Sequence, residues 1–493
     1  MARVDARSRR LHDTERAGKI PHMIRLTLSE IAHRLSGTLH AAGTDATEDT
    51  VVDGPVETDS REIVPGGVFV AKRGDDTDGH LFVDAAVDRG AALAIVEHPL
   101  ESAVAQIVVE DAVTALGELA RFVVERVRAA GNLTVIGITG SNGKTTTKNM
   151  LERILSAEGE TVAPIRSFNN SVGAPTTMLR TTESTRYLIV EMGASGIGDI
   201  ARLVSMAKPD IGVVLKVGLA HAGGFGGIDA TLAAKTEMVT DLAADGVAVL
   251  NADDFRVASM AERTSARVLR FGEDPSAEIR ASDISGSRTG TAFTAHVPGE
   301  EPVRVQLRVL GEHHVWNALA AIAVARTVGV PLARSAAALE TLSRAERWRM
   351  EVLGGRDDVT IINDAYNASP DSMSAAIKTL AQISEPGKRT IAVLGAMSEL
   401  GEYSGEEHDR IGLQLVRLNI SRLVVVGQEA RRMHISAINE GSWDGESVYF
   451  GDMDAAYDYL AAEITPGDTV LVKSSNSAKL RFLGDRLGEL FSW

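Results

Sequence analysis

The stretch Gly137-Ile-Thr-Gly-Ser-Asn-Gly-Lys-Thr-Thr-Thr147 decides how this chain folds around its main site. An apolar run at 133–138 precedes the glycines and an amphipathic segment at 144–157 follows them. This order predicts a strand, a tight turn and a helix. Glycines let backbone N–H groups point at phosphate oxygens, and the helix N-terminus adds partial positive charge. The stretch therefore predicts a phosphate-binding loop for ATP.

The spacing of this loop differs from that of the usual phosphate loop. Ile138 stands where the first glycine is expected, and Gly137 and Gly140 lie to either side of it. Lys144 is expected to reach the β- and γ-phosphates, and Thr145 to ligate Mg²⁺. The alternative is a glycine-rich turn that binds no ligand. The residues predicted to contact ATP here are Gly140, Ser141, Asn142, Gly143, Lys144, Thr145 and Thr146.

Apolar runs and helical stretches alternate outward from the loop. Continuous apolar strands separated by helices are typical of a parallel sheet covered on both faces. A polar segment at 277–308 predicts an antiparallel ribbon at the edge of that sheet. The strands expected around the loop are at 187–190, 211–214 and 247–250, with helices at 144–157 and 230–242. A second series after Arg347 has runs at 359–362, 390–394, 423–426 and 469–472.

These patterns predict an α/β fold of three domains. Residues 23–131 are expected to form a small mixed α/β N-terminal domain. Residues 132–346 are expected to form a central parallel-sheet domain of the P-loop ATPase type, and residues 347–493 a C-terminal Rossmann-like domain. A length of 493 residues agrees with this division, since a domain averages roughly 150 residues. Residues 1–22 contain several arginines without an apolar stretch and predict a disordered extension rather than a signal peptide.

Composition excludes several classes of protein. The net charge of −16 argues against a general nucleic-acid binder, which needs clustered Lys and Arg for phosphate contacts. The chain has no cysteine, so it has no disulfide and no thiol nucleophile, which fits a reducing compartment. No apolar run approaches the roughly 20 residues that span a bilayer. We therefore expect a cytoplasmic protein without membrane insertion.

The loop at 139–146 resembles that of the Mur ligases, which build the peptide of bacterial cell-wall precursors. The resemblance extends over almost the whole chain after Met23. It is carried by Thr58-Asp-Ser-Arg61, Asp78-Gly-His80, Ser167-Phe-Asn-Asn170-Ser-Val-Gly173, Val190-Glu-Met-Gly193, Ala234-Lys-Thr-Glu237 and Gly311-Glu-His-His-Val-Trp-Asn317.

The last domain discriminates between members of this family. Asn363-Asp-Ala-Tyr-Asn-Ala-Ser-Pro-Asp371 and Gly395-Ala-Met-Ser-Glu-Leu-Gly401 resemble the member that adds D-alanyl-D-alanine, and the Asp-Asn-Pro-Arg motif of the diaminopimelate-adding member does not occur. The resemblance implies UDP-N-acetylmuramoyl-tripeptide and D-alanyl-D-alanine as substrates and a monomeric enzyme. The chain has Lys473-Ser-Ser-Asn476 where the family often has Lys-Gly-Ser-Arg. Lys473 is therefore expected to take a larger part in binding the dipeptide carboxylate.

The resemblance implies ligation through an acyl phosphate, with release of ADP and phosphate. Two anions must approach each other in this reaction, so it requires cations, supplied by Lys144 and Mg²⁺. Besides Thr145, Glu191 and His221 are the expected metal ligands. Lys235 is expected to be a carbamylated, metal-binding lysine. The alternatives are a solvated strand-end Glu191, a surface His221 and a solvated Lys235.

Further site residues are implied by the same resemblance. Asn170, or alternatively Asn169, is expected near the γ-phosphate and the substrate carboxylate, unless it only forms a turn. Arg349, or alternatively Arg347, is expected to contact the γ-phosphate. Asn317 is expected to open a helix, either as an adenine contact or as an N-cap. Asp364 is expected to bond the ribose, with Tyr366 and Asn367 beside it, and the alternative is an ordinary turn. Ser60 and Arg61 are expected to contact the uridine diphosphate, and the alternative is a capped turn with a surface arginine.

Two other functions share parts of this pattern. A folylpolyglutamate synthetase has the same type of loop, but the first domain and Tyr366-Asn-Ala-Ser-Pro-Asp371 argue against it. A nucleotide-gated binding module would use the loop as a switch, but it needs no second metal. We also expect the second and third domains to close over ATP and exclude water, which would hydrolyse an acyl phosphate.

Overall fold

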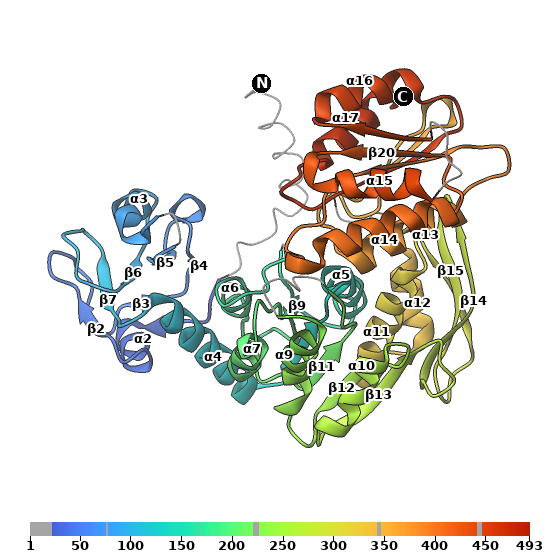
Figure 1. Cartoon of the computed structure of the whole chain (residues 1–493). Coiled ribbons are helices and arrows are strands. Elements are labelled where there is room, and N and C mark those ends of the chain that lie inside the picture. The colour runs from blue at the N-terminus through green and yellow to red at the C-terminus, as the bar shows by residue number, and fades with distance from the viewer. Residues whose placement is uncertain (1–21, 75–76, 166, 220–225, 343–346, 441–445) are drawn as a thin grey trace. The chain divides into compact units, whose positions relative to one another are not determined.

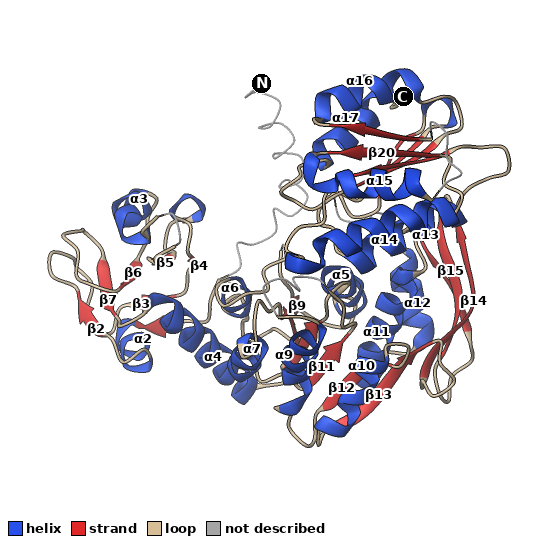
Figure 2. Ribbon diagram, in the orientation of Figure 1, coloured by secondary structure: helices blue, strands red, loops and turns tan. Residues whose placement is uncertain are grey.

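The computed structural model describes residues 22–74, 77–165, 167–219, 226–342, 347–440 and 446–493. The predicted extension at 1–22 and His221 lie outside these residues, except for His22. The described chain forms three larger sheets, which confirms the expected α/β fold (Figures 1 and 2). Among the described residues, no helix combines the length and the apolar character that crossing a bilayer requires.

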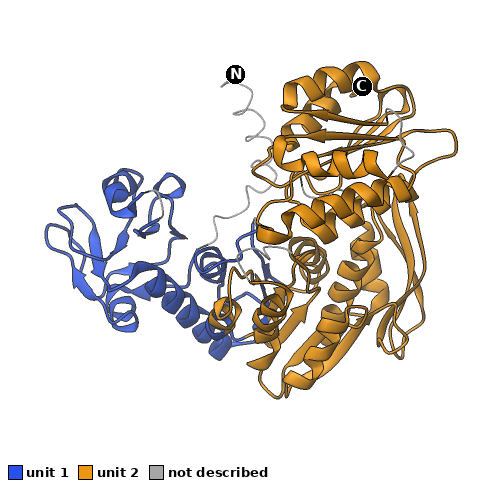
Figure 3. Ribbon diagram, viewed as in Figure 1, with its two compact units in different colours: residues 1–135, 160–190, 205–208 blue, residues 136–159, 191–204, 209–493 orange. Residues whose placement is uncertain are grey.

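Two compact units divide the chain (Figure 3). One comprises residues 1–135, 160–190 and 205–208, and the other comprises residues 136–159, 191–204 and 209–493. The second unit contains the whole phosphate loop and all of the chain that follows residue 208. The three domain boundaries expected from the sequence remain predictions.

The first sheet has five strands in the order β2-β7-β6-β5-β4. Only β2 is antiparallel to its neighbour. The strands are β2 (Thr38–His40), β4 (Val56–Glu57), β5 (Val68–Val70), β6 (Leu93–Val96) and β7 (Ala105–Val108), and the helices beside them are α2 (Leu28–Arg34), α3 (Val83–Asp88) and α4 (Ala112–Ala130). A separate antiparallel pair joins β1 (Leu26–Thr27) to β3 (Val51–Val52).

A buried histidine fastens this sheet to the turn before α3. His80 lies 2.5 Å from Asp78 through Nδ1 and accepts a 2.8 Å hydrogen bond at Nε2 from the backbone N–H of Glu97. Glu97 directly follows β6. The Asp-Gly-His motif therefore has a structural role, since both ring nitrogens of His80 are occupied.

The second sheet has nine strands in the order β16-β15-β14-β13-β12-β11-β8-β10-β9. The pairs from β11 through β14 are parallel, and β14, β15 and β16 form the antiparallel ribbon that the polar segment predicted. The strands are β8 (Thr134–Thr139), β9 (Thr161–Val162), β10 (Tyr187–Glu191), β11 (Ile211–Val214), β12 (Val247–Asn251), β13 (Arg267–Gly272), β14 (Ile279–Ser287), β15 (Gly290–His296) and β16 (Val303–Leu307). The helices are α5 (Lys144–Leu155), α6 (Gly173–Met178), α7 (Asp199–Ala207), α9 (Ile228–Thr240), α10 (Phe255–Ser259), α11 (His313–Thr327) and α12 (Leu332–Glu340).

The third sheet has six strands in the order β17-β18-β22-β19-β20-β21, all parallel except β17. The strands are β17 (Glu351–Gly354), β18 (Thr360–Asn363), β19 (Thr390–Leu394), β20 (Arg422–Val426), β21 (Ser447–Phe450) and β22 (Thr469–Lys473). The helices are α13 (Pro370–Gln382), α14 (Ser404–Arg417), α15 (Arg431–Asn439), α16 (Met453–Glu463) and α17 (Arg481–Leu490).

Alternate side chains of the central strands in this sheet enter separate cores. In β19, Ala392 and Leu394 pack in one core with residues of α13, α14 and α15. Ile391 and Val393 pack in the other core with residues of α16 and α17. Figure 2 shows α15 and α16 on opposite sides of β20. Because both faces are covered, the strands are continuously apolar rather than alternating, and this is why the sequence pattern identified them.

Candidate active site

The phosphate loop connects β8 to α5, as its sequence predicts. Gly140 and Gly143 have φ angles of +154° and +88°, values that residues with a Cβ atom rarely adopt. Gly143 is the N-cap of α5 and supplies no side-chain hydrogen bond. A Cβ atom on Gly143 would lie 2.3 Å from Oδ1 of Asn317. The first turn of α5 therefore has no side-chain cap, and such helix starts bind anions.

Lys144 folds back over this loop. Its Nζ donates a 2.7 Å hydrogen bond to the carbonyl oxygen of Gly140. Burial lowers the pKa of Lys144, the carboxylate of Glu191 raises it, and the guanidinium of Arg349 lowers it further. The ammonium is thus held half-buried at the mouth of the loop, beside both a negative and a second positive group.

Glu191 is the last residue of β10 and is fully buried. Its Oε2 accepts a 3.2 Å hydrogen bond from Oγ1 of Thr145, while its Oε1 has no hydrogen bond to any described residue. Burial raises the pKa of Glu191, and Lys144 is the largest opposing influence. A buried carboxylate oxygen with no donor, beside the loop threonine, fits a divalent cation that prefers oxygen ligands.

The described residues contain no group of three His, Cys, Asp or Glu side chains that could hold a metal by itself. A cation at Glu191 would therefore need the hydroxyl of Thr145 and oxygens from the nucleotide or water. His221, the other expected ligand, lies outside the described residues.

Lys235 lies in α9 and is 5% exposed. Burial, followed by the charge of Lys144, lowers the pKa of Lys235 to about 7. The alternative of a solvated lysine is therefore wrong, because the described fold buries this side chain. A lysine with this pKa is partly neutral near neutral pH, which a nucleophilic amine requires.

Asn317 lies in α11, which begins at His313, so the expectation that Asn317 opens a helix is wrong. Its side chain does not cap a backbone N–H group. Oδ1 accepts a 3.3 Å hydrogen bond from Oγ1 of Thr147, and Nδ2 lies 3.3 Å from Nδ1 of His314. These contacts attach α11 to the helix that follows the phosphate loop.

A cavity of about 390 Å³ opens beside Asn142 and Gly143 of the loop. Its wall combines the apolar Leu215 and Phe271 with His313 and Trp316. Burial and then the charges of Lys473 and Lys216 lower the pKa of His313 to about 4, so its imidazole is neutral. The sequence motif contained His313 and Trp316, but nothing in it indicated that they line a cavity with residues about a hundred positions away.

The third domain contacts the loop through the start of α13. Oγ of Ser369, the N-cap of α13, donates a 3.1 Å hydrogen bond to Oδ1 of Asn142. Nζ of Lys216 lies 3.0 Å from Oδ1 of Asp371. The sequence did not predict either contact. The Ser-Pro pair signals a helix start, but no local pattern indicates which loop that helix meets.

Asp364 follows β18 and is held on both sides. Its Oδ1 accepts a 3.0 Å hydrogen bond from the backbone N–H of Met350, and its Oδ2 lies 2.6 Å from Nζ of Lys473. The same ammonium also donates to the carbonyl oxygens of Asp364 and Asn367, and Lys473 is 2% exposed. Lys473 thus supports the 364–367 turn, and its expected contact with a dipeptide carboxylate remains a prediction.

Arg349 and Arg347, the two candidates for the γ-phosphate, differ in their surroundings. The guanidinium of Arg349 lies 4.2 Å from the ring centre of Tyr366 and influences the pKa values of Lys144 and Glu191. Arg347 is 54% exposed and pairs with Asp485 at 3.0 Å. The surroundings of Arg349 therefore favour it over Arg347 as the candidate for the γ-phosphate contact. Asn476, which replaces the arginine common in the family, accepts a 2.9 Å hydrogen bond at its carbonyl from Arg481.

The remaining expected residues lie in the first compact unit. Ser60 and Arg61 are on a short 3₁₀ helix (Ser60–Glu62), where exposed Arg61 pairs with Asp59 at 2.7 Å. Oδ1 of Asn170 accepts hydrogen bonds from the backbone N–H groups of Val172 and Gly173, so Asn170 forms the turn before α6. Asn169 lies beside it and is half-buried.

A phosphate loop with a buried carboxylate and a buried lysine, joined to a Rossmann-like domain that contacts the loop, is the arrangement expected of an ATP-dependent ligase. The chain belongs to the Mur ligase family. Residues 138–325 match the Mur ligase middle domain, residues 348–476 the Mur ligase, glutamate ligase domain, and residues 55–124 the Mur ligase family, catalytic domain. The family predicted from the sequence motifs is therefore confirmed.

Individual relatives match over nearly their full length. The UDP-N-acetylmuramoyl-tripeptide–D-alanyl-D-alanine ligase of Mycobacterium tuberculosis is 42% identical over 501 aligned positions, covering 94% of this chain and 98% of the relative. The structure of MurF from Acinetobacter baumannii has a TM-score of 0.85 and 31% identity, covering 95% and 100% of the two chains. MurF ligase from Thermotoga maritima in complex with ADP has a TM-score of 0.76 and 29% identity, covering 89% and 96%.

Proposed function

We propose that this protein joins D-alanyl-D-alanine to UDP-N-acetylmuramoyl-tripeptide, using ATP and releasing ADP and phosphate, in peptidoglycan precursor synthesis. The observation that carries the proposal is the 42% identity to a ligase of that name over 98% of its length. The loop, Glu191 and Lys235 support it, because they supply the groups that an ATP-dependent acyl transfer needs.

The reaction proceeds in two steps. A carboxylate oxygen of the tripeptide attacks the γ-phosphorus of ATP, the bond from that phosphorus to the ADP oxygen breaks, and an acyl phosphate forms. The amine of D-alanyl-D-alanine then attacks the acyl carbon, loses a proton and displaces phosphate. Both steps bring negative groups together, so positive charge must be concentrated at the loop. Lys144 and Arg349, whose charges both lower the pKa of Glu191, would supply it.

The nucleotide would extend from the loop into the neighbouring cavity. The N–H groups of α5's first turn would hold the phosphates, and the cavity of about 390 Å³ would take the base and ribose. The apolar wall of Leu215 and Phe271 suits a flat ring. Asn317 would lie near the base, and Asp364, with Tyr366 and Asn367, near the ribose.

Mg²⁺ would bind to Thr145 and Glu191, with His221 as a further ligand. When bound, it neutralises charge on the phosphates. Lys235 would be carbamylated and ligate a second ion, which its pKa of about 7 supports, since only the neutral amine reacts with carbon dioxide. Oε1 of Glu191, which accepts no hydrogen bond from any described residue, supports the proposed Mg²⁺ site at Thr145 and Glu191.

The other contacts complete the proposal. Asn170, or alternatively Asn169, would meet the substrate carboxylate, Ser60 and Arg61 the uridine diphosphate, and Lys473 the dipeptide carboxylate. The protein would act as a monomer in the cytoplasm, where ATP and the UDP-linked precursor are made.

Phosphate release from ATP tests the proposed reaction. The purified protein is assayed with Mg²⁺ and with each substrate alone, both together, or neither. We expect release only when both UDP-N-acetylmuramoyl-tripeptide and D-alanyl-D-alanine are present, because the amine must capture the acyl phosphate. Versions of the precursor with lysine, ornithine or diaminopimelate at the third position would identify that residue.

Matched variants make this assay specific. Lys144→Ala is expected to lower the rate by roughly 100-fold or more, because the phosphates lose a cation. Lys388→Ala, which removes an exposed ammonium, is expected to have no effect. Release with neither substrate would favour a nucleotide-gated module, and release with a folate and glutamate would favour a folylpolyglutamate synthetase.

A further inference from the structure

The segment at 347–350, here called the strap, has a strained backbone. Trp348 and Met350 have φ angles of +62° and +52°, in the left-handed region that side chains disfavour. Arg349 lies between them. Two strained residues that flank a third persist only where the surrounding structure holds them, and such strain gathers at functional sites. The contacts that hold the strap therefore decide where Arg349 points.

Backbone hydrogen bonds hold the strap on the side facing β18. The backbone N–H of Met350 donates to Oδ1 of Asp364 at 3.0 Å, and the carbonyl oxygen of Trp348 accepts from the N–H of Tyr366 at 3.1 Å. The N–H of Trp348 donates to Oε2 of Glu351 at 3.0 Å. These bonds fix the main chain but leave the indole of Trp348 to be held by another group.

Asp485 in α17 holds that indole. Nε1 of Trp348 lies 3.0 Å from Oδ1 and 3.1 Å from Oδ2 of Asp485. Nδ2 of Asn363 donates to Oδ1 at 3.0 Å, and NH2 of Arg347 lies 3.0 Å from Oδ2. One carboxylate, 20% exposed, thus joins the strap to the end of β18. The guanidinium of Arg481, one turn earlier in α17, lies 5.3 Å from the indole's ring centre.

The strap presents Arg349 to the phosphate loop. The guanidinium packs over Tyr366, and Arg349 lines a small cavity together with Thr146 and Asn149 of α5. Its charge acts on Lys144 and Glu191. A shift of the Trp348 backbone out of the left-handed region would redirect the next residue. The position of Arg349 thus depends on a carboxylate that does not itself face the loop.

We infer that Asp485 is a positioning residue for the ligase reaction, which acts by locking Trp348 so that the strap holds Arg349 at the phosphate loop. This inference rests on the proposed function, in which Arg349 contacts the γ-phosphate. Asp485 is not a catalytic residue, because its partners are Trp348, Asn363 and Arg347 rather than a reacting atom. A purely structural brace would have the same contacts, so the test must separate the two roles.

A double-mutant cycle on full-length protein separates them. Rates with ATP and both substrates are measured for wild type, Asp485→Asn, Arg349→Ala and the double variant. Asp485→Asn keeps the shape of the side chain but replaces one carboxylate oxygen with an NH2 group. That group cannot accept the hydrogen bonds that Trp348, Asn363 and Arg347 donate. We expect it to lower kcat about tenfold with the KM for D-alanyl-D-alanine unchanged. In the Arg349→Ala background it should change kcat by less than about twofold, because the group it positions is gone.

Two further variants guard the interpretation. Trp348→Phe keeps the ring and removes only the Nε1 donor, so it should lower kcat in the same direction and to a smaller extent. Arg486→Ala removes the neighbouring residue of α17, which pairs with the exposed Asp454 and lies over the ring of Tyr457, and should leave kcat unchanged. Thermal unfolding of each variant shows whether it is folded.

Each outcome decides the inference. If the effects of Asp485→Asn and Arg349→Ala on kcat are independent and multiply, Asp485 has only a structural role and the inference is overturned. Full activity of Arg349→Ala would overturn it as well, while substrate-dependent phosphate release by wild type would still support the ligase function. A wild-type protein without that release would instead overturn the proposed function.

Discussion

At Lys235, burial and the charge of Lys144 act in the same direction and lower its pKa to about 7. In carbamylation the amine nitrogen bonds to the carbon of carbon dioxide and loses a proton, so only the neutral amine reacts. The neutral fraction falls as the pH drops through about 7. Carbamylation of Lys235 should therefore depend on pH near neutrality, whereas an exposed lysine, with a pKa near 10.4, would stay protonated there.

We expect preincubation with bicarbonate to activate the protein more at about pH 8 than at about pH 6, because more Lys235 is neutral at the higher pH. The ligase rate is then measured at one common assay pH. The same preincubation of Lys235→Met should change nothing at either pH. Equal activation of wild type at both values would contradict the role of the amine.

Removing the side chain makes a second prediction at the residue scale. Lys235→Ala should lose most activity, and short carboxylates such as formate or acetate should restore part of it by replacing the carbamate oxygens. Phosphate release measures the rescue. Lys144→Ala serves as control, since a carboxylate cannot replace a cation. Full activity of Lys235→Ala without any carboxylate would remove the metal-binding role.

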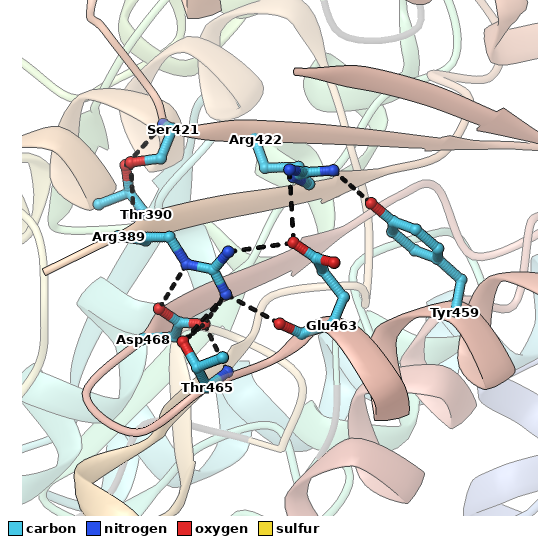
Figure 4. A network of polar contacts seen from close by, with 8 residues as sticks. All are labelled: Arg389, Thr390, Ser421, Arg422, Tyr459, Glu463, Thr465 and Asp468. Atoms are coloured by element: carbon cyan, nitrogen blue, oxygen red, sulfur yellow. Dashed lines mark hydrogen bonds and ion pairs between the residues drawn. The ribbon is translucent and has the colours of Figure 1, made fainter. Parts of the chain in front are cut away.

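At the scale of elements, the strands of the third domain have an ion-pair network at one end and the proposed site residues at the other. Figure 4 shows a network around Arg389 and Asp468, which directly precede β19 and β22. Arg389 donates to both oxygens of Asp468 and to Glu463, which also pairs with Arg422. Asp364 and the ammonium of Lys473 lie at the opposite, carboxyl ends of their strands. The network therefore supports the sheet without entering the site.

We expect Arg389→Ala to reduce the free energy of unfolding by about 2 kcal/mol, because Asp468, 2% exposed, keeps its charge without its main partner. The partial exposure of Arg389 keeps the expected value below that of a fully buried pair. Denaturant unfolding measures the change, and kcat per folded molecule should stay the same. Lys388→Ala, whose pairing with Asp358 is exposed, is the control and should cost less than about 1 kcal/mol. A loss of kcat in Arg389→Ala would contradict the separation of the two strand ends.

At the scale of the whole molecule, ATP and substrate should draw the second and third domains together. Ser369 and Lys216 already connect α13 to the loop region. Nucleotide binding would add further contacts between these two parts of the chain. We expect the radius of gyration from small-angle scattering to fall when Mg²⁺, ATP and the UDP precursor are added. Lys144→Ala should respond less. An unchanged profile for wild type would count against closure.

The sequence by itself determined the local part of the site. β8, the loop and α5 follow from a short pattern of apolar residues and glycines, and the continuously apolar strands of β12 or β19 follow from burial on both faces. Glu191 and Lys235 were assigned to a strand end and a helix correctly, because these positions depend only on neighbouring residues. The motif of the phosphate loop also identified the family, and the motifs of the last domain indicated the member.

Only the tertiary structure decided which of these residues meet and what their surroundings do to them. Lys473 bonds to Asp364, Asp485 to Trp348 and Asn317 to Thr147, and each pair is separated by more than a hundred positions in the chain. The start of α11 was misjudged for the same reason. Local patterns record propensity and periodicity, whereas desolvation and pairing depend on which distant segments pack together.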